Sequence, residues 1–273
     1  MMLSRPPRPN LTPFVDLLWA SDDAVPSNPK ASAKEIVLPT GATHIVFRLG
    51  ETPLQLYAAP DDTTAQDIGN ALIGGPRAGS YIKATSNREP TVGIMLRPGA
   101  AELMLGVSAL DLAERHTRID DIWSHAQIDE IRTRLQETLN LEERLSIIEG
   151  YLLIRLPRMQ GIHPLIMHSL EQFRLSSPVG KVVEKSGFSH RYFTKLFTET
   201  VGLRPKTYCR VLRFGRILDR IQSEPNIGWA ALAIDEGYAD QAHLNRDFQA
   251  FTSLTPGAYR KAAPTAPRHI PLP

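Results

Sequence analysis

The sequence predicts an α+β protein with a β-rich N-terminal domain and an all-helical C-terminal domain. Short β-prone runs fill the first 98 residues, the apolar period becomes helical from about residue 109, and one stretch of the helical part is duplicated. The expected boundaries are 1–157 for the first domain with its trailing helices, 158–162 for a linker, 163–262 for the helical domain and 263–273 for a disordered tail.

The β-rich part consists of short runs separated by turn residues. "EIVLPTGATHIVFRL" gives two strands, 35–38 and 43–49, and "TVGIMLRPGA" is a strand that stops at Pro98. "ALIGGPRAGSYIKATS" predicts a strand, a glycine-rich turn and a second strand. The turn, 74–79, lacks the Lys-Ser/Thr pair of a phosphate loop and opens no long helix. Short strands of this kind favour an antiparallel sandwich or barrel.

Two helical stripes follow the strands. Both could pack on the N-terminal domain or on a second copy of the same helices, so the sequence leaves 127–156 as a dimerisation or coupling element. The stripes are formed by Ile128, Ile131, Leu135 and Leu139, and then by Leu141, Leu145, Ile148, Leu152 and Leu156. The segment 157–163 carries Pro and Gly and is typical of a linker.

The distribution of charge is uneven along the chain. Residues 163–262 hold fourteen Lys and Arg against nine Asp and Glu, whereas residues 1–162 hold sixteen against twenty. A basic C-terminal half suggests a polyanionic partner for that half. No apolar run is long enough to span a bilayer, and no apolar stretch follows the basic start as in a signal peptide, so we expect no membrane partner. The single cysteine, Cys209, favours a reducing cytoplasm and a packing thiol.

The helical part contains an internal duplication. "GFSHRYFTKLFTETVGLRPKTYCR" at 187–210 aligns with "GYADQAHLNRDFQAFTSLTPGAYR" at 237–260, with one extra residue near the start of the second helix. Each copy predicts a short helix, a glycine that closes it in the left-handed conformation, and a capped second helix. The caps are Ser189 and Asp240. A turn of three or four residues between such helices is typical of a DNA-binding helix-turn-helix.

The outward faces of the two second helices are polar. The inner faces carry Phe193, Leu196 and Phe197 in the first helix, and Leu244, Phe248 and Phe251 in the second. The side chains expected to meet DNA are His190, Arg191, Thr194, Lys195, Gln241, Ala242, His243, Asn245 and Arg246. Arg and Lys suit guanine, Gln and Asn suit adenine, and Ala can touch a thymine methyl group.

One helix is expected to join the two units. "RPKTYCRVLRFGRILDRIQSEP" places Tyr208, Val211, Leu212, Leu218 and Ile221 on one stripe. Its arginines, Arg210, Arg213, Arg216 and Arg220, lie elsewhere, and the sequence leaves open whether they contact phosphates or only solvent. A helix of this length would hold two recognition helices near adjacent major grooves, one DNA turn apart.

These residues resemble the AraC/XylS family of bacterial transcription regulators. "EGYADQAHLNRDFQAFTSLTPGAYR" is similar to that family's second helix-turn-helix, and "SGFSHRYFTKLF" with "GLRPKTY" to the first. The resemblance covers 163–262 and implies sequence-specific binding to double-stranded DNA, with base contacts from Arg191, Thr194, Lys195, Gln241, Ala242, His243 and Arg246. Ile234 stands where a polar residue is usual, and Ala242 cannot hydrogen-bond a base. The second helix is therefore expected to read fewer bases or to depend more on phosphate contacts and DNA shape.

The N-terminal part resembles the all-β sensor domains found in front of this DNA-binding domain. "LPTGATHIVFRL" and "GIMLRPGAAELMLGV" carry that resemblance, which implies a cupin-like domain with trailing helices. Such a domain is expected to modulate DNA binding through a small-molecule effector, through a homodimer, or through both. No metal site or cofactor is expected, because His44, His116 and His125 stand alone in the sequence. Trp19 and Trp123 fit core packing better than a pocket.

The sequence leaves one alternative of another class. An enzyme or a DNA-repair alkyl transferase can carry an accessory helix-turn-helix domain. An alkyl transferase needs a reactive cysteine outside that domain, whereas Cys209 lies inside it. An enzyme built on the β-rich domain needs a metal or acid-base cluster before residue 100, and the sequence shows none. A regulator is therefore the interpretation that the sequence favours, and it predicts no enzymatic activity.

Overall fold

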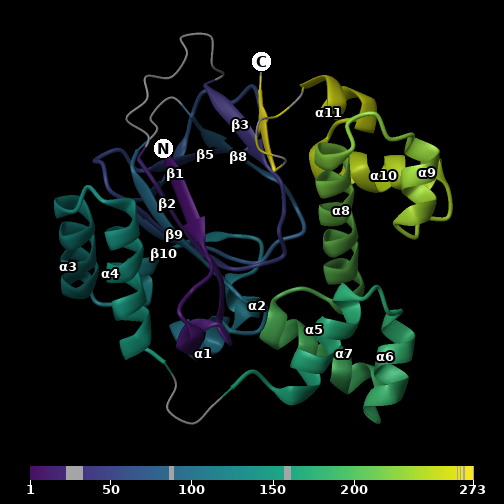
Figure 1. Ribbon diagram of the computed structural model, residues 1–273, viewed down its shortest axis with the longest axis horizontal. Helices are drawn as coiled ribbons and strands as arrows, with labels where there is room; N and C mark the ends of the chain where they lie inside the picture. The colour runs from purple at the N-terminus through teal and green to yellow at the C-terminus, as the bar shows by residue number, and fades with distance from the viewer. Residues whose placement is uncertain are drawn as a thin grey trace.

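Two antiparallel sheets and eleven α-helices form the part of the chain described by the computed structural model. That part comprises residues 1–22, 33–85, 89–156, 161–262, 264, 266 and 268–272. The β-rich domain lies on one side and the helical domain on the other, with the long helix α8 between the two helix-turn-helix units (Figure 1). The predicted α+β class is confirmed, with a β-rich N-terminal domain, trailing helices and a C-terminal all-α domain. Residues 158–160 of the predicted linker lie outside the described residues.

The first sheet has six strands in the order β1-β2-β9-β4-β7-β10, and the second has five in the order β11-β3-β8-β5-β6. The strands are β1 (Met2–Arg5), β2 (Val15–Ser21), β3 (Lys34–Val37), β4 (His44–Arg48), β5 (Leu54–Tyr57), β6 (Gln66–Gly69), β7 (Ala71–Gly74), β8 (Tyr81–Ala84), β9 (Thr91–Leu96), β10 (His116–Arg118) and β11 (His269–Pro271). Strand β10 falls in a region for which the sequence predicts helix. Its pairing with β7 supplies the backbone partners that a three-residue strand cannot supply alone.

The helices divide between the two domains. In the N-terminal domain they are α1 (Ala101–Leu105), α2 (Ala109–Leu112), α3 (His125–Glu137) and α4 (Leu141–Ile154), with short 3-10 turns η1 (Pro9–Leu11) and η2 (Ile119–Asp121). In the C-terminal domain they are α5 (Pro164–Arg174), α6 (Val179–Ser186), α7 (His190–Val201), α8 (Pro205–Ser223), α9 (Trp229–Asp235), α10 (Gln241–Thr252) and α11 (Pro256–Ala262).

The two predicted stripes of α3 and α4 pack on the six-stranded sheet of their own domain. Ile131 and Leu135 of α3 and Ile148 of α4 are fully buried in that core. Leu139 is an exception, because α3 ends at Glu137 and the Asn140 side chain caps α4. Leu139 is therefore 81% exposed in the connection, and its predicted place on the stripe is wrong. Trp123 is 4% exposed and packs against Phe47, as expected for a core residue.

Alternation along the strands separates the two faces of the six-stranded sheet. Ile45 and Phe47 of β4 face the helices and are fully buried. Their neighbours His44, Val46 and Arg48 point to the opposite face, toward the second sheet, and stay partly accessible. The space between the sheets is thus lined by polar as well as apolar side chains.

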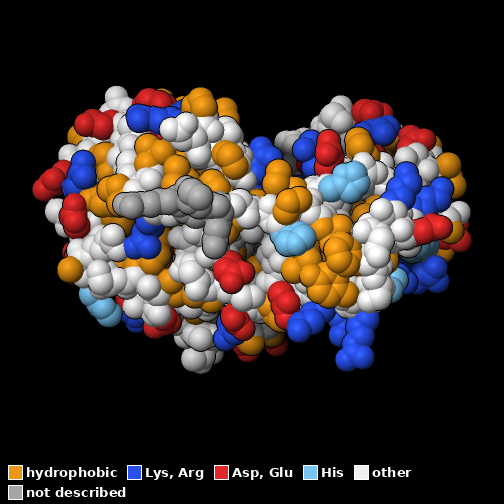
Figure 2. Space-filling model, turned by 90° about the horizontal axis from the view of Figure 1, so that it is seen from below, with side chains coloured by type: hydrophobic (Ala, Val, Ile, Leu, Met, Phe, Trp, Pro, Cys, Tyr) orange, Lys and Arg blue, Asp and Glu red, His pale blue; other side chains and the backbone are white. Residues whose placement is uncertain are grey.

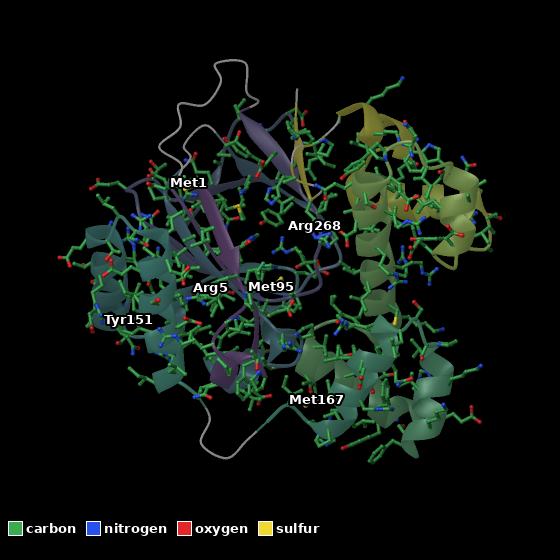
Figure 3. All side chains as sticks on the ribbon, viewed as in Figure 1. Met1, Arg5, Met95, Tyr151, Met167 and Arg268 are labelled. Carbon is green, nitrogen blue, oxygen red and sulfur yellow. The ribbon has the colours of Figure 1, made fainter. Side chains whose placement is uncertain are left out.

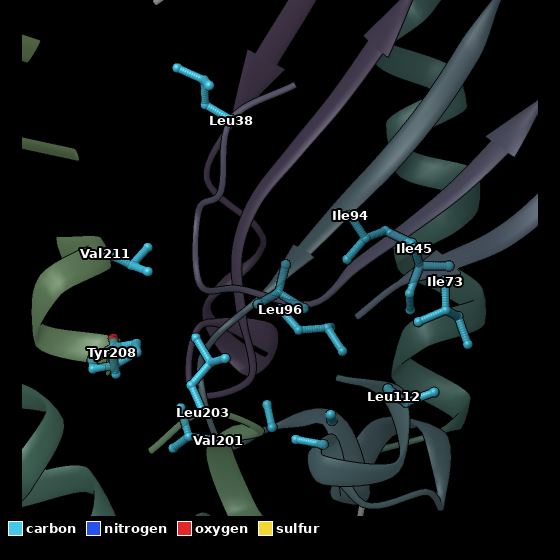
Figure 4. Close-up of a cluster of buried hydrophobic side chains, with 14 of the residues drawn as sticks. Leu38, Ile45, Ile73, Ile94, Leu96, Leu112, Val201, Leu203, Tyr208 and Val211 are labelled. Carbon is cyan, nitrogen blue, oxygen red and sulfur yellow. The ribbon is translucent and has the colours of Figure 1, made fainter. Parts of the chain in front are cut away.

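The two domains share one continuous hydrophobic core. Val201, Leu203, Tyr208 and Val211 of the C-terminal domain lie in the same buried cluster as Leu96 of β9, as Figure 4 shows. At Gly41, with φ 72°, a Cβ atom would lie 3.3 Å from the Val211 side chain. The backbone after β3 therefore approaches α8 closely, and a larger residue there would push the domains apart.

The C-terminal segment is not the disordered tail that the sequence predicts. Strand β11 pairs antiparallel with β3, so the end of the chain returns to the N-terminal domain. Ile270 is 2% exposed, and the Leu38 N–H donates to the Arg268 carbonyl at 2.8 Å. Prolines favour disorder only where apolar burial and backbone pairing are lacking, and here Ile270 and the edge of β3 supply both.

An ion-pair cluster ties the N-terminal segment to α4. The Glu149 carboxylate is fully buried, with Arg5 Nη2 at 2.8 Å and Arg8 Nε at 3.2 Å. Burial alone would raise the pKa of Glu149, but the hydrogen bonds from Arg5 and Arg8 outweigh it and lower the pKa. Glu142 also contacts Arg5, at 2.7 Å, but its side chain is 55% exposed.

Replacing Glu149 with Gln is expected to lower the free energy of unfolding by about 1–3 kcal/mol at pH 7, because the two guanidinium groups lose a charged acceptor. A carboxylate whose pKa is lower in the folded protein stabilises it above the pKa of the unfolded chain, about 4.3. The difference between wild type and Glu149→Gln should therefore shrink as the pH falls below about 4. Urea denaturation at several pH values measures it.

Glu142→Gln is the matched control, because the same guanidinium loses an exposed partner. It should change the free energy of unfolding by less than about 1 kcal/mol. Equal effects of the two substitutions would contradict the role given to burial.

Candidate nucleic-acid interface

The first helix-turn-helix unit consists of α6 and α7. Gly187, with φ 74°, ends α6 in the left-handed conformation. The Ser189 hydroxyl oxygen then accepts a hydrogen bond of 3.2 Å from the Tyr192 N–H and so starts α7. Phe193 and Phe197 are fully buried, which fixes the rotation of α7 about its axis. The sequence predicts this local geometry correctly.

The outer face of α7 carries the predicted basic residues. His190, Arg191 and Lys195 are exposed, and the Lys195 side chain has 73% of its surface accessible. Thr194 is half-buried, with its Oγ1 3.3 Å from His190 Nδ1. Lys195 Nζ lies 3.8 Å from Glu199 Oε1, a surface pair that can break at little cost. The N-terminal half of α7 thus offers a basic ridge.

The second unit repeats this geometry with α9 and α10. Gly237, with φ 76°, makes the turn, and the Asp240 carboxylate accepts from the His243 N–H at 2.6 Å. Leu244 and Phe248 are each 1% exposed and face inward. An acidic cap stabilises a helix N-terminus because it satisfies a free N–H and complements the helix dipole.

The outer face of α10 carries four of the five predicted contact residues in the open. Gln241, Ala242, Asn245 and Arg246 are exposed. His243 is half-buried, and its ring meets the Tyr238 ring edge-on at 5.0 Å. His243 is therefore less available to a ligand than the sequence suggests.

Helix α8 holds both units through two aromatic clusters. At its beginning, Tyr208 packs edge-on against Phe197 of α7, with ring centroids 5.7 Å apart. Further along, Phe214 packs against Phe248 at 5.4 Å and against Phe251 at 4.6 Å. Figure 1 shows α6 and α7 at one end of α8, and α9 and α10 at the other.

The arginines of α8 form ion pairs and hydrogen bonds with the second unit. Arg210 Nη2 lies 2.7 Å from Asp247 Oδ1, and Arg216 Nε lies 2.8 Å from Glu236 Oε2. Asp247 is 6% exposed, whereas the Arg210 side chain keeps 45% of its surface accessible. These partners lie on α10 and just after α9, and nothing in the spacing of the sequence indicates which acid each arginine meets.

The other two arginines also turn toward the second unit. Arg213 Nη1 donates to the Gly237 carbonyl at 3.3 Å, and its guanidinium lies over the Tyr238 ring. Arg220 Nε lies 2.9 Å from Glu224 and its Nη2 lies 3.5 Å from Asp235. The four arginines of α8 therefore hold the second unit against this helix.

The C-terminal end of α7 rests on the N-terminal domain. Ser108 Oγ donates to the Glu199 carbonyl at 2.9 Å. At Gly202, with φ 84°, a Cβ atom would lie 2.3 Å from the Pro76 ring and 2.7 Å from the Ala109 carbonyl oxygen. Only glycine fits this contact. One end of α7 is therefore anchored, while its N-terminal half stays open.

An exposed aromatic pair lies beside the first recognition helix. Phe188 and Tyr192 are each 47% exposed and stack with ring centroids 5.0 Å apart. Figure 2 shows the helical half of the molecule from below, where Lys and Arg side chains project beside apolar surface. The sequence prediction did not include this pair, although two aromatic residues four apart across a helix start can signal it.

Metal binding, thiol chemistry and membrane insertion find little support in the part of the chain that the structure describes. No three His, Cys, Asp or Glu side chains there come together in a way that could hold a metal ion. Burial raises the pKa of the Cys209 thiol to about 11, so the thiol stays protonated at neutral pH. None of the helices described is long and apolar enough to cross a membrane.

Family comparisons agree with the geometry of the C-terminal domain. Residues 182–262 match the family described as "Helix-turn-helix domain", and residues 4–118 match a domain of unknown function, DUF6597. No curated protein matches the sequence significantly. The C-terminal part of the chain is an AraC-type helix-turn-helix domain, so the resemblance to the AraC/XylS family is confirmed there.

Several solved structures can be aligned with this chain over most of its length. ToxT from Vibrio cholerae in its P21 form is 9% identical, with 95% of this chain and 98% of that chain covered and a TM-score of 0.48. ToxT from Vibrio cholerae O395 is 10% identical, with 85% and 94% covered and a TM-score of 0.43. ToxT of strain SCE256 bound to an unsaturated fatty acid is 8% identical, with 86% and 97% covered and a TM-score of 0.39.

Replacing Arg210 with Ala is expected to lower the free energy of unfolding by about 1–3 kcal/mol, because the Asp247 carboxylate stays buried without its partner. DNA affinity should fall as the second unit loosens, while the slope of log affinity against log salt stays unchanged, since no phosphate contact is lost. Urea denaturation and DNA titrations at several salt concentrations measure the two effects.

Lys206→Ala is the control, since Lys206 is an exposed cation near the start of the same helix. It should change the free energy of unfolding by less than about 0.5 kcal/mol. An Arg210→Ala protein of normal stability with a shallower salt slope would show that Arg210 contacts phosphate instead.

Proposed function

We propose that this chain is a sequence-specific DNA-binding transcription regulator that inserts α7 and α10 into adjacent major grooves. The observation that carries the proposal is that the polar N-terminal halves of both helices are exposed at the two ends of one continuous helix. The inner faces of both helices are buried, so each helix has only its polar face to offer a ligand.

The length of α8 supports binding to successive grooves. Its nineteen residues rise about 28 Å at 1.5 Å per residue. Adjacent major grooves on one side of B-DNA lie about 34 Å apart. The aromatic contacts that hold α7 and α10 are made at Tyr208 and Phe214, within this length, and the two units extend toward opposite ends of α8 (Figure 1). This arrangement supports a spacing of the order of one turn of the duplex.

The exposed side chains suit base edges in the major groove. Arg191 and Lys195 can donate to guanine O6 and N7, and Gln241 or Asn245 can pair with adenine N6 and N7. Ala242 can touch a thymine methyl group. His190, Thr194, His243 and Arg246 complete the proposed contact set. The excess of Lys and Arg in residues 163–262 would supply the salt-dependent attraction to phosphates.

The N-terminal domain is proposed to modulate DNA binding in the cytoplasm through a small-molecule effector, a homodimer, or both. The close contacts at Gly202 and Gly41 support this, because a shift of the β-rich domain would reach α7 and α8 directly. The outer side of α4, where Ile154 is 81% exposed, is the face that we propose for a second copy.

The burial of Cys209 argues against the alternative that the chain is an alkyl transferase. Its thiol is partly buried on α8 and has a raised pKa, whereas a nucleophilic thiol needs a lowered one. The regulator is therefore the function that we propose, without an enzymatic activity.

Alanine substitutions of Arg191, Lys195 and Arg246 test the proposed contacts. Each should cost about 1–3 kcal/mol of binding free energy if it removes a bidentate base contact, that is, about 5- to 150-fold in Kd. The duplex should be one selected by the wild-type chain from a random pool, and the measurement is fluorescence anisotropy at fixed salt. The selected duplexes should share two blocks about 10 base pairs apart.

Arg118→Ala is the control, because it removes one exposed positive charge from the N-terminal domain. It should bind normally, and all four variants should keep the circular dichroism spectrum and Tm of the wild type. Unchanged affinity and salt dependence in all three recognition-helix variants would refute the assignment.

A further inference from the structure

Two histidines flank Gly74 on the face of the six-stranded sheet that points toward the second sheet. His44 of β4 and His116 of β10 both pair with Gly74 of β7, one from each side. A Cβ atom on Gly74 would lie 3.7 Å from His116 Nε2 and 3.9 Å from the His44 Cβ. Because glycine has no side chain, the position between the two imidazole rings is left without a side chain of its own.

Arg77 joins this pair from the loop that follows β7. Its Nη2 donates to His116 Nδ1 at 3.2 Å, and its guanidinium lies over the Tyr81 ring at 4.5 Å. A guanidinium can only donate, so His116 Nδ1 accepts and the proton of a neutral His116 is on Nε2, the atom beside Gly74. Among the described residues, His116 Nε2 has no hydrogen-bond partner.

Arg77 has no carboxylate in direct contact among the described residues. It is 8% exposed, and the charge of Glu114 acts on it without forming an ion pair, since the Glu114 carboxylate accepts from the Ala78 N–H at 2.7 Å. On the facing sheet, Glu35 is held by Lys83 at 3.0 Å and by His269 at 2.8 Å. Removing a guanidinium from water is costly when no carboxylate contacts it directly.

A second guanidinium, that of Arg268, lies near the end of the chain and within electrostatic reach of His44. Arg268 precedes β11, and Figure 3 places it between the β-rich domain and α8. Its Nη1 is buried and has no hydrogen-bond partner among the described residues, and its Nη2 lies 3.2 Å from where a Cβ atom on Gly215 would be. Glycine at this point of α8 leaves room for the guanidinium.

The two histidines add donors to this cluster without adding charge. Burial, followed by the positive charge of Arg77, lowers the pKa of His44 to about 4 and that of His116 to about 3. Arg268 also lowers the pKa of His44, so both arginines lie within electrostatic reach of that ring. His44 Nε2 shares a hydrogen bond of 2.8 Å with Thr40.

We propose that Arg77, Arg268 and His116, beside Gly74, form a binding site for the oxyanion of a small molecule, a carboxylate or a phosphate. Two guanidinium groups and a free N–H donor suit an anion, and they would repel a cation. Trp19 and Met95 stand beside His44, the first edge-on at 5.9 Å and the second as its cross-strand neighbour, and would flank the body of the ligand.

The position of Arg268 in the chain links this site to the DNA-binding domain. Arg268 lies between α11, the last helix of that domain, and β11, which pairs with β3. An anion held by Arg77 and Arg268 together would fasten this C-terminal strand to the β-rich domain and stabilise one arrangement of the domains. The inference names a ligand class for the effector proposed above and in that respect rests on it.

The test is thermal unfolding of the full chain with sodium phosphate, sodium acetate or sodium benzoate, each against sodium chloride at equal ionic strength. The Tm of the wild type should rise with the concentration of at least one oxyanion. Because such anions also stabilise proteins non-specifically, the quantity compared is the rise in the wild type minus the rise in each variant. A phosphate response indicates a phosphorylated ligand, and an acetate or benzoate response indicates a carboxylic acid.

Arg77→Met should lose the oxyanion-dependent rise, and its Tm without oxyanion should not fall below that of the wild type, because a buried charge that no described carboxylate contacts has been removed. Arg268→Met, which keeps the backbone pairing of its segment, should lose most of the rise as well. Arg115→Ala removes an exposed charge next to His116 and should respond like the wild type.

Equal rises in the wild type and both methionine variants, or no rise with any of the three oxyanions, would overturn the site. The experiment contains no DNA, so it can fail while the DNA-binding function stands, and the DNA titrations can fail while the site stands.

Discussion

The packing of two aromatic clusters onto α8 is the constraint on which the DNA-binding geometry depends. Phe197 meets Tyr208 near the start of the helix, and Phe248 and Phe251 meet Phe214 further along. Aromatic side chains bury large apolar areas in few rotamers, so each cluster fixes both the position and the rotation of its recognition helix. The arginines of α8 add charge pairs that hold the second unit in place. The polar faces of α7 and α10 then remain exposed at a fixed separation.

Helix α8 and the residues next to it also connect the DNA-binding domain to the β-rich domain. The loop at Gly41 lies close to α8, and the turn at Gly202 touches the N-terminal domain at a distance that only glycine allows. The C-terminal strand closes a third connection through Ile270 and the edge of β3. A protein with three such contacts between its domains transmits a local change as a movement of whole elements, since packed cores shift between discrete arrangements.

Local patterns explain which features the sequence predicts well. Caps such as Ser189 and Asp240 and a closing glycine such as Gly187 depend only on neighbouring residues, so the duplicated units could be read from the sequence. Arg210 and Asp247 are thirty-seven residues apart, and strand β11 pairs with residues more than two hundred positions earlier. Such partners are chosen by the tertiary fold. For the same reason His44 and His116 stand alone in the sequence and meet only when β4 and β10 flank β7.

A distance between the two helix-turn-helix units tests the central claim most directly. Spin labels on Glu184→Cys of α6 and Gln249→Cys of α10, both exposed, in a Cys209→Ser background would report it by pulsed electron paramagnetic resonance. If α8 holds the units rigidly, the chain gives one narrow distance distribution that DNA leaves unchanged. A broad or two-component distribution, or a shift on adding DNA, would contradict a fixed spacing of the recognition helices.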